Sequence, residues 1–146
     1  MVRDLHPAEI EEVLREESFG RIGCNGERGV YIVPITYAYD GTFVYCYSAD
    51  GMKLDYMRKD PLVCFEVDRI EDATNWRSVI AWGMYEELEN RDADDAVEQI
   101  SVRLRTIASR ANAETMRSYV LRSGQFGVAY RIRLTEKHGR VAASES

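Results

Sequence analysis

The sequence contains few of the residues on which metal sites, disulfide frameworks and nucleophilic active sites depend. It has only three cysteines and two histidines in 146 residues, and both histidines lie close to the termini. Cys24, Cys46 and Cys64 are widely spaced within apolar segments, which is typical of buried free thiols and not of zinc ligands or paired half-cystines. We therefore expect no metal centre and no nucleophile activated by a histidine.

Long hydrophobic runs and an excess of basic residues are also missing. No segment approaches the roughly 18 apolar residues of a membrane span, and residues 1–7 lack the apolar run of a signal peptide. A net charge of −6 and a pI near 5.0 argue against nucleic-acid binding, since no basic stripe is present to contact phosphates. These absences predict one soluble domain over residues 1–146, expected in the cytoplasm without a membrane partner.

The spacing of the apolar residues predicts strands joined mostly by tight turns, with helices packed outside them. Helical spacing is found over residues 7–17, 52–59 and 92–111, with a short helical turn over 114–122. Strand patterns cover residues 19–24, 30–39, 42–48, 62–68, 76–88 and 126–134. The polar residues 69–75 are expected to form a loop, and Gly83 within a long strand predicts a bulge or a bend. The predicted fold is mainly β with flanking helices: a small closed or split barrel of six or so antiparallel strands.

The predicted strand over residues 30–39 is apolar on both faces. One face carries Tyr31, Val33, Ile35, Tyr37 and Tyr39, and the other carries Val30, Ile32, Pro34 and Ala38. A strand that is apolar on both faces is buried on both faces. We therefore expect the barrel core on one side and a partner subunit on the other.

Residues 47–53 follow a strand, open a short helix and contain the groups needed to hold a phosphate. Ser48 offers a hydroxyl, Lys53 a positive charge, and Gly51 a backbone that a ligand can approach closely. The free N–H groups of the first helical turn also favour an anion. The same residue types occur in ordinary turns, and Lys53 considered alone is more typical of a solvated helix, so both interpretations stand at this point.

A resemblance to a known family is carried by five segments taken in order. They are Gly20-Arg21-Ile22-Gly23, residues 31–37 with Tyr39-Asp40-Gly41, Tyr47-Ser48-Ala49 with Gly51-Met52-Lys53-Leu54, residues 60–68, and Trp76-Arg77-Ser78-Val79 with Gly83 and Glu86. In this order and spacing they resemble the pyridoxamine 5'-phosphate oxidase-related flavoproteins of the FMN-binding split-barrel fold. The branch that includes the nitroimidazole-resistance proteins is the most similar. The resemblance covers residues 5–90 well and the final strand more loosely.

The resemblance implies a homodimer with two FMN sites at the subunit interface. It implies that Ser48 and Lys53 hold the flavin phosphate with help from Gly51, and that residues 33–36 lie beside the isoalloxazine ring. Side chains from residues 76–79 would reach over from the second protomer. The cofactor-binding residues expected on this basis are Val33, Pro34, Ile35, Thr36, Tyr47, Ser48, Ala49, Gly51, Met52, Lys53, Trp76, Ser78 and Val79. Without the resemblance, Pro34 and Ile35 fit core and strand-edge positions equally well.

A bound flavin would supply the redox chemistry, which suits a sequence without an evident catalytic acid, base or nucleophile. We expect an FMN-dependent reductase or oxidase that acts on a small aromatic or heteroaromatic molecule, with electrons from a nicotinamide donor or a redox partner. Nitroimidazole-resistance relatives commonly carry a histidine where this sequence has Tyr47, which does not exchange a proton near neutral pH. The alternatives are a non-catalytic flavin- or haem-binding module that stores or senses, and a deazaflavin-dependent reductase.

Pyridoxamine 5'-phosphate oxidase activity itself is not favoured. The substrate of that reaction carries its own phosphate, and the sequence has no evident basic cluster that would bind this second phosphate.

Overall fold

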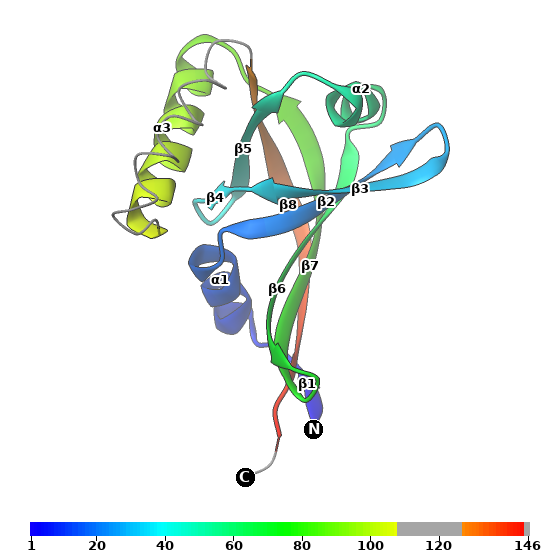
Figure 1. Cartoon of the computed structure of the whole chain (residues 1–146), viewed down its shortest axis with the longest axis vertical. Helices are drawn as coiled ribbons and strands as arrows, with labels where there is room; N and C mark the ends of the chain where they lie inside the picture. The colour runs from blue at the N-terminus through cyan, green and yellow to red at the C-terminus, as the bar shows by residue number, and fades with distance from the viewer. Residues whose placement is uncertain (108–126, 145–146) are drawn as a thin grey trace.

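Eight strands form one antiparallel sheet in the computed structural model, which describes residues 1–107 and 127–144 (Figure 1). Hydrogen-bonded neighbours follow the order β3-β2-β6-β7-β8-β5-β4, and β1 pairs with β8. The strands are β1 (Val2–Asp4), β2 (Phe19–Gly26), β3 (Gly29–Thr36), β4 (Ala38–Tyr39), β5 (Phe43–Ala49), β6 (Leu62–Asp72), β7 (Asn75–Glu87) and β8 (Gly127–Ala142). The helices are α1 (Pro7–Glu16), α2 (Met52–Lys59) and α3 (Asn90–Ile107).

The sheet closes into a split barrel because its two end strands are consecutive in the sequence. β3 and β4 stand at opposite ends of the strand order, yet only Tyr37 separates them along the chain. Tyr37 is 1% exposed, and its hydroxyl donates a hydrogen bond to the carbonyl of Leu14 in α1 at 2.8 Å. The corner is therefore anchored in the core, while one edge of β3 has no strand partner within residues 1–107 and 127–144.

The inward faces of the strands supply the main core, which α1 and α2 close. Val13 and Leu14 of α1 and Leu54 and Met57 of α2 are fully buried. A second, smaller cluster lies between α3 and the outer side of β4, β5 and β8, so α3 covers that side of the barrel (Figure 1). None of the helices in the described residues is long and apolar enough to cross a bilayer.

The predicted helices are confirmed, and α2 occupies the same eight residues as predicted. The pattern that ends it is Asp60-Pro61, since a residue before proline disfavours helical geometry. The end of the third predicted helix, from residue 108, and the predicted helical turn over residues 114–122 lie outside the described residues.

The prediction of a loop over residues 69–75 is wrong. β6 continues to Asp72 and β7 begins at Asn75, so the two strands form one long hairpin with a two-residue turn. The carboxylate of Asp72 accepts hydrogen bonds from the backbone N–H of Thr74 at 2.8 Å and from Asn75 Nδ2 at 2.9 Å. The polar residues that indicated a loop are therefore the exposed part of a ribbon and its turn.

The number and length of the strands also differ from the prediction. The last strand runs to Ala142 instead of residue 134, because β7 pairs with it along the whole polar stretch. The predicted strand over residues 30–39 is divided at Tyr37, and β1, with only three residues, was not predicted.

Gly83 lies at a bulge, as its position within the strand predicted. Trp82 pairs with Glu136 while Gly83 pairs with Leu134, so Thr135 is the extra residue. A Cβ at Gly83 would lie 2.4 Å from the carbonyl oxygen of Arg133, which is backbone and cannot rotate away.

We expect Gly83→Ala to lower the free energy of unfolding by about 1–3 kcal/mol, as for other overpacked sites. Urea denaturation measures this change. Gly51→Ala is the control, since a Cβ at Gly51 meets nothing within 4 Å and its backbone is extended, and its effect should stay within about 0.5 kcal/mol. Equal stability of the two variants would contradict the prediction.

Candidate functional site

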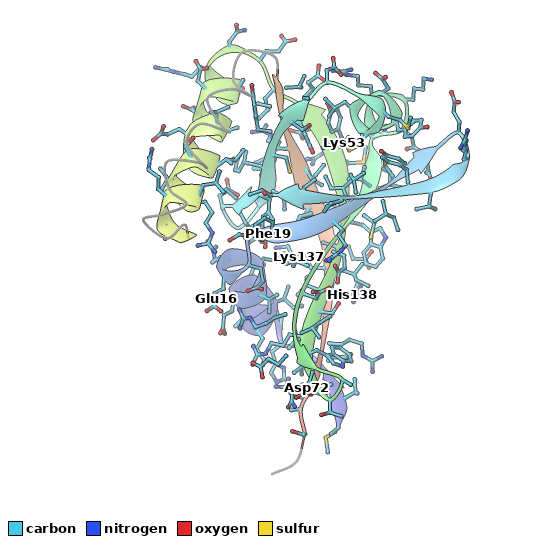
Figure 2. All side chains as sticks on the ribbon, in the orientation of Figure 1. Glu16, Phe19, Lys53, Asp72, Lys137 and His138 are labelled. Atoms are coloured by element: carbon cyan, nitrogen blue, oxygen red, sulfur yellow. The ribbon has the colours of Figure 1, made fainter. Side chains whose placement is uncertain are left out.

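The segment between β5 and α2 gathers the groups predicted to hold a phosphate. Lys53 is half-buried in the first turn of α2, at the end of the barrel that this helix covers (Figure 2). Among the described residues no carboxylate lies within 4.0 Å of its ammonium, and burial lowers the pKa of this lysine. The N-cap Gly51 places no side-chain hydrogen bond on the helix start, so backbone N–H groups of the first turn are available to an anion.

Ser48 also contributes an unpaired group, although it faces the barrel interior. Its Oγ is buried and makes no hydrogen bond of full geometry in the described parts of the chain; the hydroxyl of Tyr130, which also lacks one, lies close enough to interact with it. Burial raises the pKa of Tyr130 and raises that of Cys46, its cross-strand partner, to about 12. An unpaired buried hydroxyl costs roughly 1–3 kcal/mol, so a ligand oxygen at Ser48 would remove a penalty. Contact with a ligand at the surface requires Oγ to leave this enclosed rotamer.

Three other predicted residues of this segment point away from the phosphate position or into solvent. Tyr47 lies on the opposite face of β5 from Ser48, where it lines a groove of about 610 Å³ between α3 and β8. A Cβ added at Gly127 would lie 2.3 Å from the Tyr47 ring, so the ring packs directly on that strand. Ala49 and Met52 are exposed.

The residues predicted to lie beside the flavin ring occupy the free edge of the sheet. β3 pairs with β2 on one side, and no ladder joins its other edge to a strand of the described residues. Alternate backbone N–H and C=O groups of this edge can therefore bind a planar polar ligand. Pro34 faces outward and Ile35 packs in the core, while Val33 and Thr36 are half-buried. Proline suits such an edge because it has no N–H to donate to a further strand.

The third predicted group lies on β7, far from α2 within one chain. Trp76 and Ser78 are half-buried on the outward face of β7, whereas Val79 is fully buried in the core. The turn between β6 and β7 lies at the opposite end of the long axis from α2 (Figure 1). One chain therefore does not bring these residues to Lys53, and the side chain of Val79 is not available to a ligand.

A charged cluster on the same outward face was not among the predicted site residues. Arg21 Nη1 lies 3.4 Å from Glu66 Oε1 and 3.6 Å from Asp68 Oδ2, and Ser78 Oγ donates a hydrogen bond to Glu66 Oε2 at 3.4 Å. Burial and the neighbouring Asp68 raise the pKa of Glu66 to about 7. The strand register places Pro34 directly beside Arg21, so the cluster borders the candidate ring position. Because Glu66 and Asp68 are two residues apart in a predicted strand, the sequence could have indicated that both carboxylates lie on the same face.

Comparisons with known proteins agree with the geometry. The family profile described as pyridoxamine 5'-phosphate oxidase matches residues 6–141. An uncharacterised protein of Rhizobium meliloti (strain 1021) is 37% identical over 87 residues, which are 60% of this chain and 58% of that relative, less than two thirds of its length.

Solved structures share the split-barrel fold over nearly the whole chain. A FAD-binding protein from Mesorhizobium loti is 29% identical and superposes with a TM-score of 0.77, covering 98% of this chain and 99% of that one. A candidate 5-nitroimidazole antibiotic resistance protein from Bacteroides thetaiotaomicron VPI-5482 is 16% identical, with a TM-score of 0.74, covering 97% of this chain and 87% of that one.

Proposed function

Because the chain belongs to the pyridoxamine 5'-phosphate oxidase family, we propose that it binds FMN and acts as an oxidoreductase on a small aromatic or heteroaromatic molecule. The observation that carries the proposal is a set of donors at the end of β5 and the start of α2 that lack strong partners among the described residues. It consists of the ammonium of Lys53, which has no carboxylate within 4.0 Å there, the start of α2 without a side-chain cap, and the buried hydroxyl of Ser48. The FAD-binding protein of Mesorhizobium loti supports a flavin as the ligand. A lysine at a helix start, without a carboxylate partner in the described part of the chain, suits the single phosphate of FMN.

In this proposal the residues bind and orient the cofactor. Lys53 and the first N–H groups of α2 balance the phosphate charge, and the free edge of β3 offers hydrogen bonds to the polar edge of the ring. When bound, the flavin supplies the transfer of hydride from a nicotinamide donor, or of electrons from a redox partner, to the substrate.

We propose further that two copies pair through the outward faces of β3, β2, β6 and β7. Ile32 is 65% exposed and lies in one row with Gly23, Cys64 and Trp82 across these four strands. The next row carries Ile80, which is 40% exposed, together with Glu66, Arg21 and Pro34, so the apolar side chains border the charged cluster described above. Surfaces of this kind mark protein interfaces. Pairing would also supply the missing third group, with Trp76 and Ser78 coming from the second copy.

The first test is the absorption spectrum of the purified protein, followed by chromatography of the chromophore that denaturation releases. We expect flavin bands and a chromophore that elutes with FMN. A chromophore that elutes with FAD would contradict FMN as the cofactor but would still support a flavin-binding protein. A band at shorter wavelength would indicate a deazaflavin. A colourless protein that takes up neither FMN nor FAD would contradict the proposed function.

Turnover separates an oxidoreductase from a storage or sensing module. In this experiment NADH or NADPH is added to the flavin-bound protein under anaerobic conditions, and a nitroaromatic electron acceptor is added afterwards. We expect bleaching of the flavin band and its recovery on addition of the acceptor. A flavin that neither nicotinamide reduces, or that the acceptor does not reoxidise although dithionite reduces it, would favour the module.

A further inference from the structure

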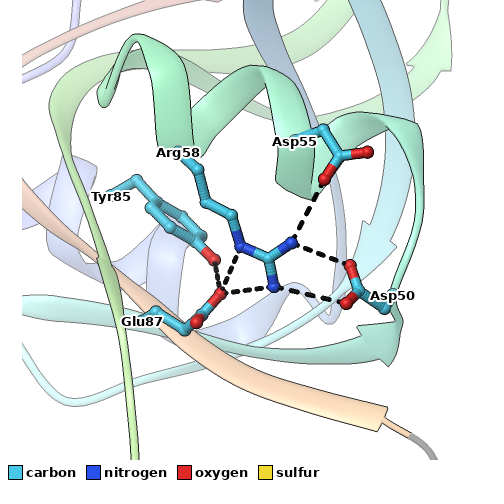
Figure 3. Close-up of polar contacts among 5 residues, drawn as sticks. All are labelled: Asp50, Asp55, Arg58, Tyr85 and Glu87. Carbon is cyan, nitrogen blue, oxygen red and sulfur yellow. Dashed lines mark hydrogen bonds and ion pairs between the residues drawn. The ribbon is translucent and has the colours of Figure 1, made fainter.

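Arg58, in the last turn of α2, joins three carboxylates from three parts of the chain (Figure 3). Its Nη1 donates to Asp50 Oδ1 at 3.0 Å and to Asp55 Oδ1 at 3.2 Å, and its Nε donates to Glu87 Oε1 at 2.8 Å. The hydroxyl of Tyr85 donates to the same oxygen of Glu87 at 2.8 Å. Arg58 thereby links the segment before α2, and α2 itself, to the end of β7.

Two of these carboxylates flank the candidate phosphate ligand along the chain. Asp50 precedes Lys53 by three residues and Asp55 follows it by two. Asp50 lies in the turn before the helix, from which it could reach this ammonium, whereas Asp55 lies on a different side of the helix and adds negative charge nearby. In the described residues both bind Arg58, and neither lies within 4.0 Å of the ammonium of Lys53. A carboxylate on Lys53 would compete with a phosphate for the same charge.

The exposure of Asp50 and Asp55 indicates that their ion pairs with Arg58 add little to the stability of the fold. The side chains of Asp50 and Asp55 are 55% and 64% exposed, and ion pairs in such positions contribute little to folding. The other end is fixed, because Tyr85 is buried and its ring packs on that of Tyr130 at 5.3 Å between centroids. The network is therefore a device that sets where two negative charges lie.

We propose that Arg58 is a positioning residue for the phosphate of the cofactor: it holds Asp50 and Asp55 away from Lys53, so that the ammonium stays available to the anion. This inference rests on the proposed function and adds a residue that acts through Lys53 without touching the ligand. Riboflavin, which has the same ring without the phosphate, distinguishes this role from a general structural one.

The test compares dissociation constants for FMN and riboflavin, measured by flavin fluorescence, for the wild-type protein, Arg58→Ala and the triple variant Arg58→Ala/Asp50→Asn/Asp55→Asn. We expect Arg58→Ala to raise the dissociation constant for FMN about tenfold or more, because one competing negative charge would then lie near Lys53. The dissociation constant for riboflavin should change less than about twofold, because riboflavin has no phosphate. The triple variant removes the released charges and should recover most of the FMN affinity. Arg69→Ala is the matched control, since Arg69 also binds two carboxylates, Glu16 and Glu17, away from α2.

The outcomes separate this inference from the proposed function. Equal loss of FMN and riboflavin in Arg58→Ala, or no recovery in the triple variant, would overturn the positioning role while the wild-type protein still binds FMN. Wild-type protein that binds neither ligand would overturn the proposed function and, with it, the role of Arg58. Loss of FMN affinity in Arg69→Ala to the same extent would show a general charge effect and would also overturn the inference.

Discussion

Replacing Lys53 by alanine is expected to weaken FMN binding by about ten- to hundredfold. Hydrogen bonds to charged groups contribute about 1.5–3 kcal/mol, and each 1.4 kcal/mol corresponds to a factor of ten in affinity. Lys53 belongs at the upper end of this range because it is half-buried and, within the described chain, has no carboxylate to neutralise it. Burial lowers its pKa, and an approaching phosphate opposes this shift by favouring the charged form.

The measurement is a titration of the apoprotein with FMN and, separately, with riboflavin. Lys59→Ala is the matched control, since Lys59 belongs to the same helix but is exposed at its other end. We expect the control to bind FMN like the wild-type protein, and we expect Lys53→Ala to bind riboflavin like the wild-type protein while its affinity for FMN falls. If both lysine variants bound FMN equally well, Lys53 would not be the phosphate ligand.

The candidate phosphate segment could be proposed from the sequence because its signals are local. The apolar strand before it, the Gly51 turn and the Asp60-Pro61 stop after α2 all lie within residues 43–61. Tyr47 and Ser48 are neighbours in β5, so strand alternation implies that they face opposite sides of the sheet. The spacing could not show which of the two faces the barrel interior; in the structure it is Ser48.

The parts that escaped prediction depend on pairing between distant segments. Arg21 meets Glu66 because β2 pairs with β6, across 45 residues, and no local pattern contains this register. In the same way Arg58 reaches Glu87 only because β7 ends beside α2. The polar residues 69–75 indicated a loop because composition reports exposure to solvent, whereas the ladder with β7 decides that most of them are strand.

The apolar outward face predicts a second large effect, at Ile32. Replacing Ile32 by glutamate would place a carboxylate in the centre of the proposed contact between two copies, in a row with Gly23 and Trp82. Burying an unpaired charge costs several kcal/mol, so the dimer dissociation constant should rise by about a hundredfold or more. The fold of one chain should persist, because this side chain is 65% exposed within it. Light scattering coupled to size-exclusion chromatography, over a range of protein concentrations, measures the change.

Flavin binding should fall together with the dimer, because Trp76 and Ser78 belong to the start of β7, and the turn before it lies at the opposite end of the long axis from α2 (Figure 1). Val102→Glu is the control: Val102 is 47% exposed on α3, so it gains the same charge outside the proposed contact. We expect this control to remain dimeric and to keep its cofactor. An Ile32→Glu variant that stays dimeric would place the contact elsewhere on the surface. A monomeric variant that still binds FMN with wild-type affinity would show instead that the groups of a single chain, Lys53 and the edge of β3, are sufficient for the site.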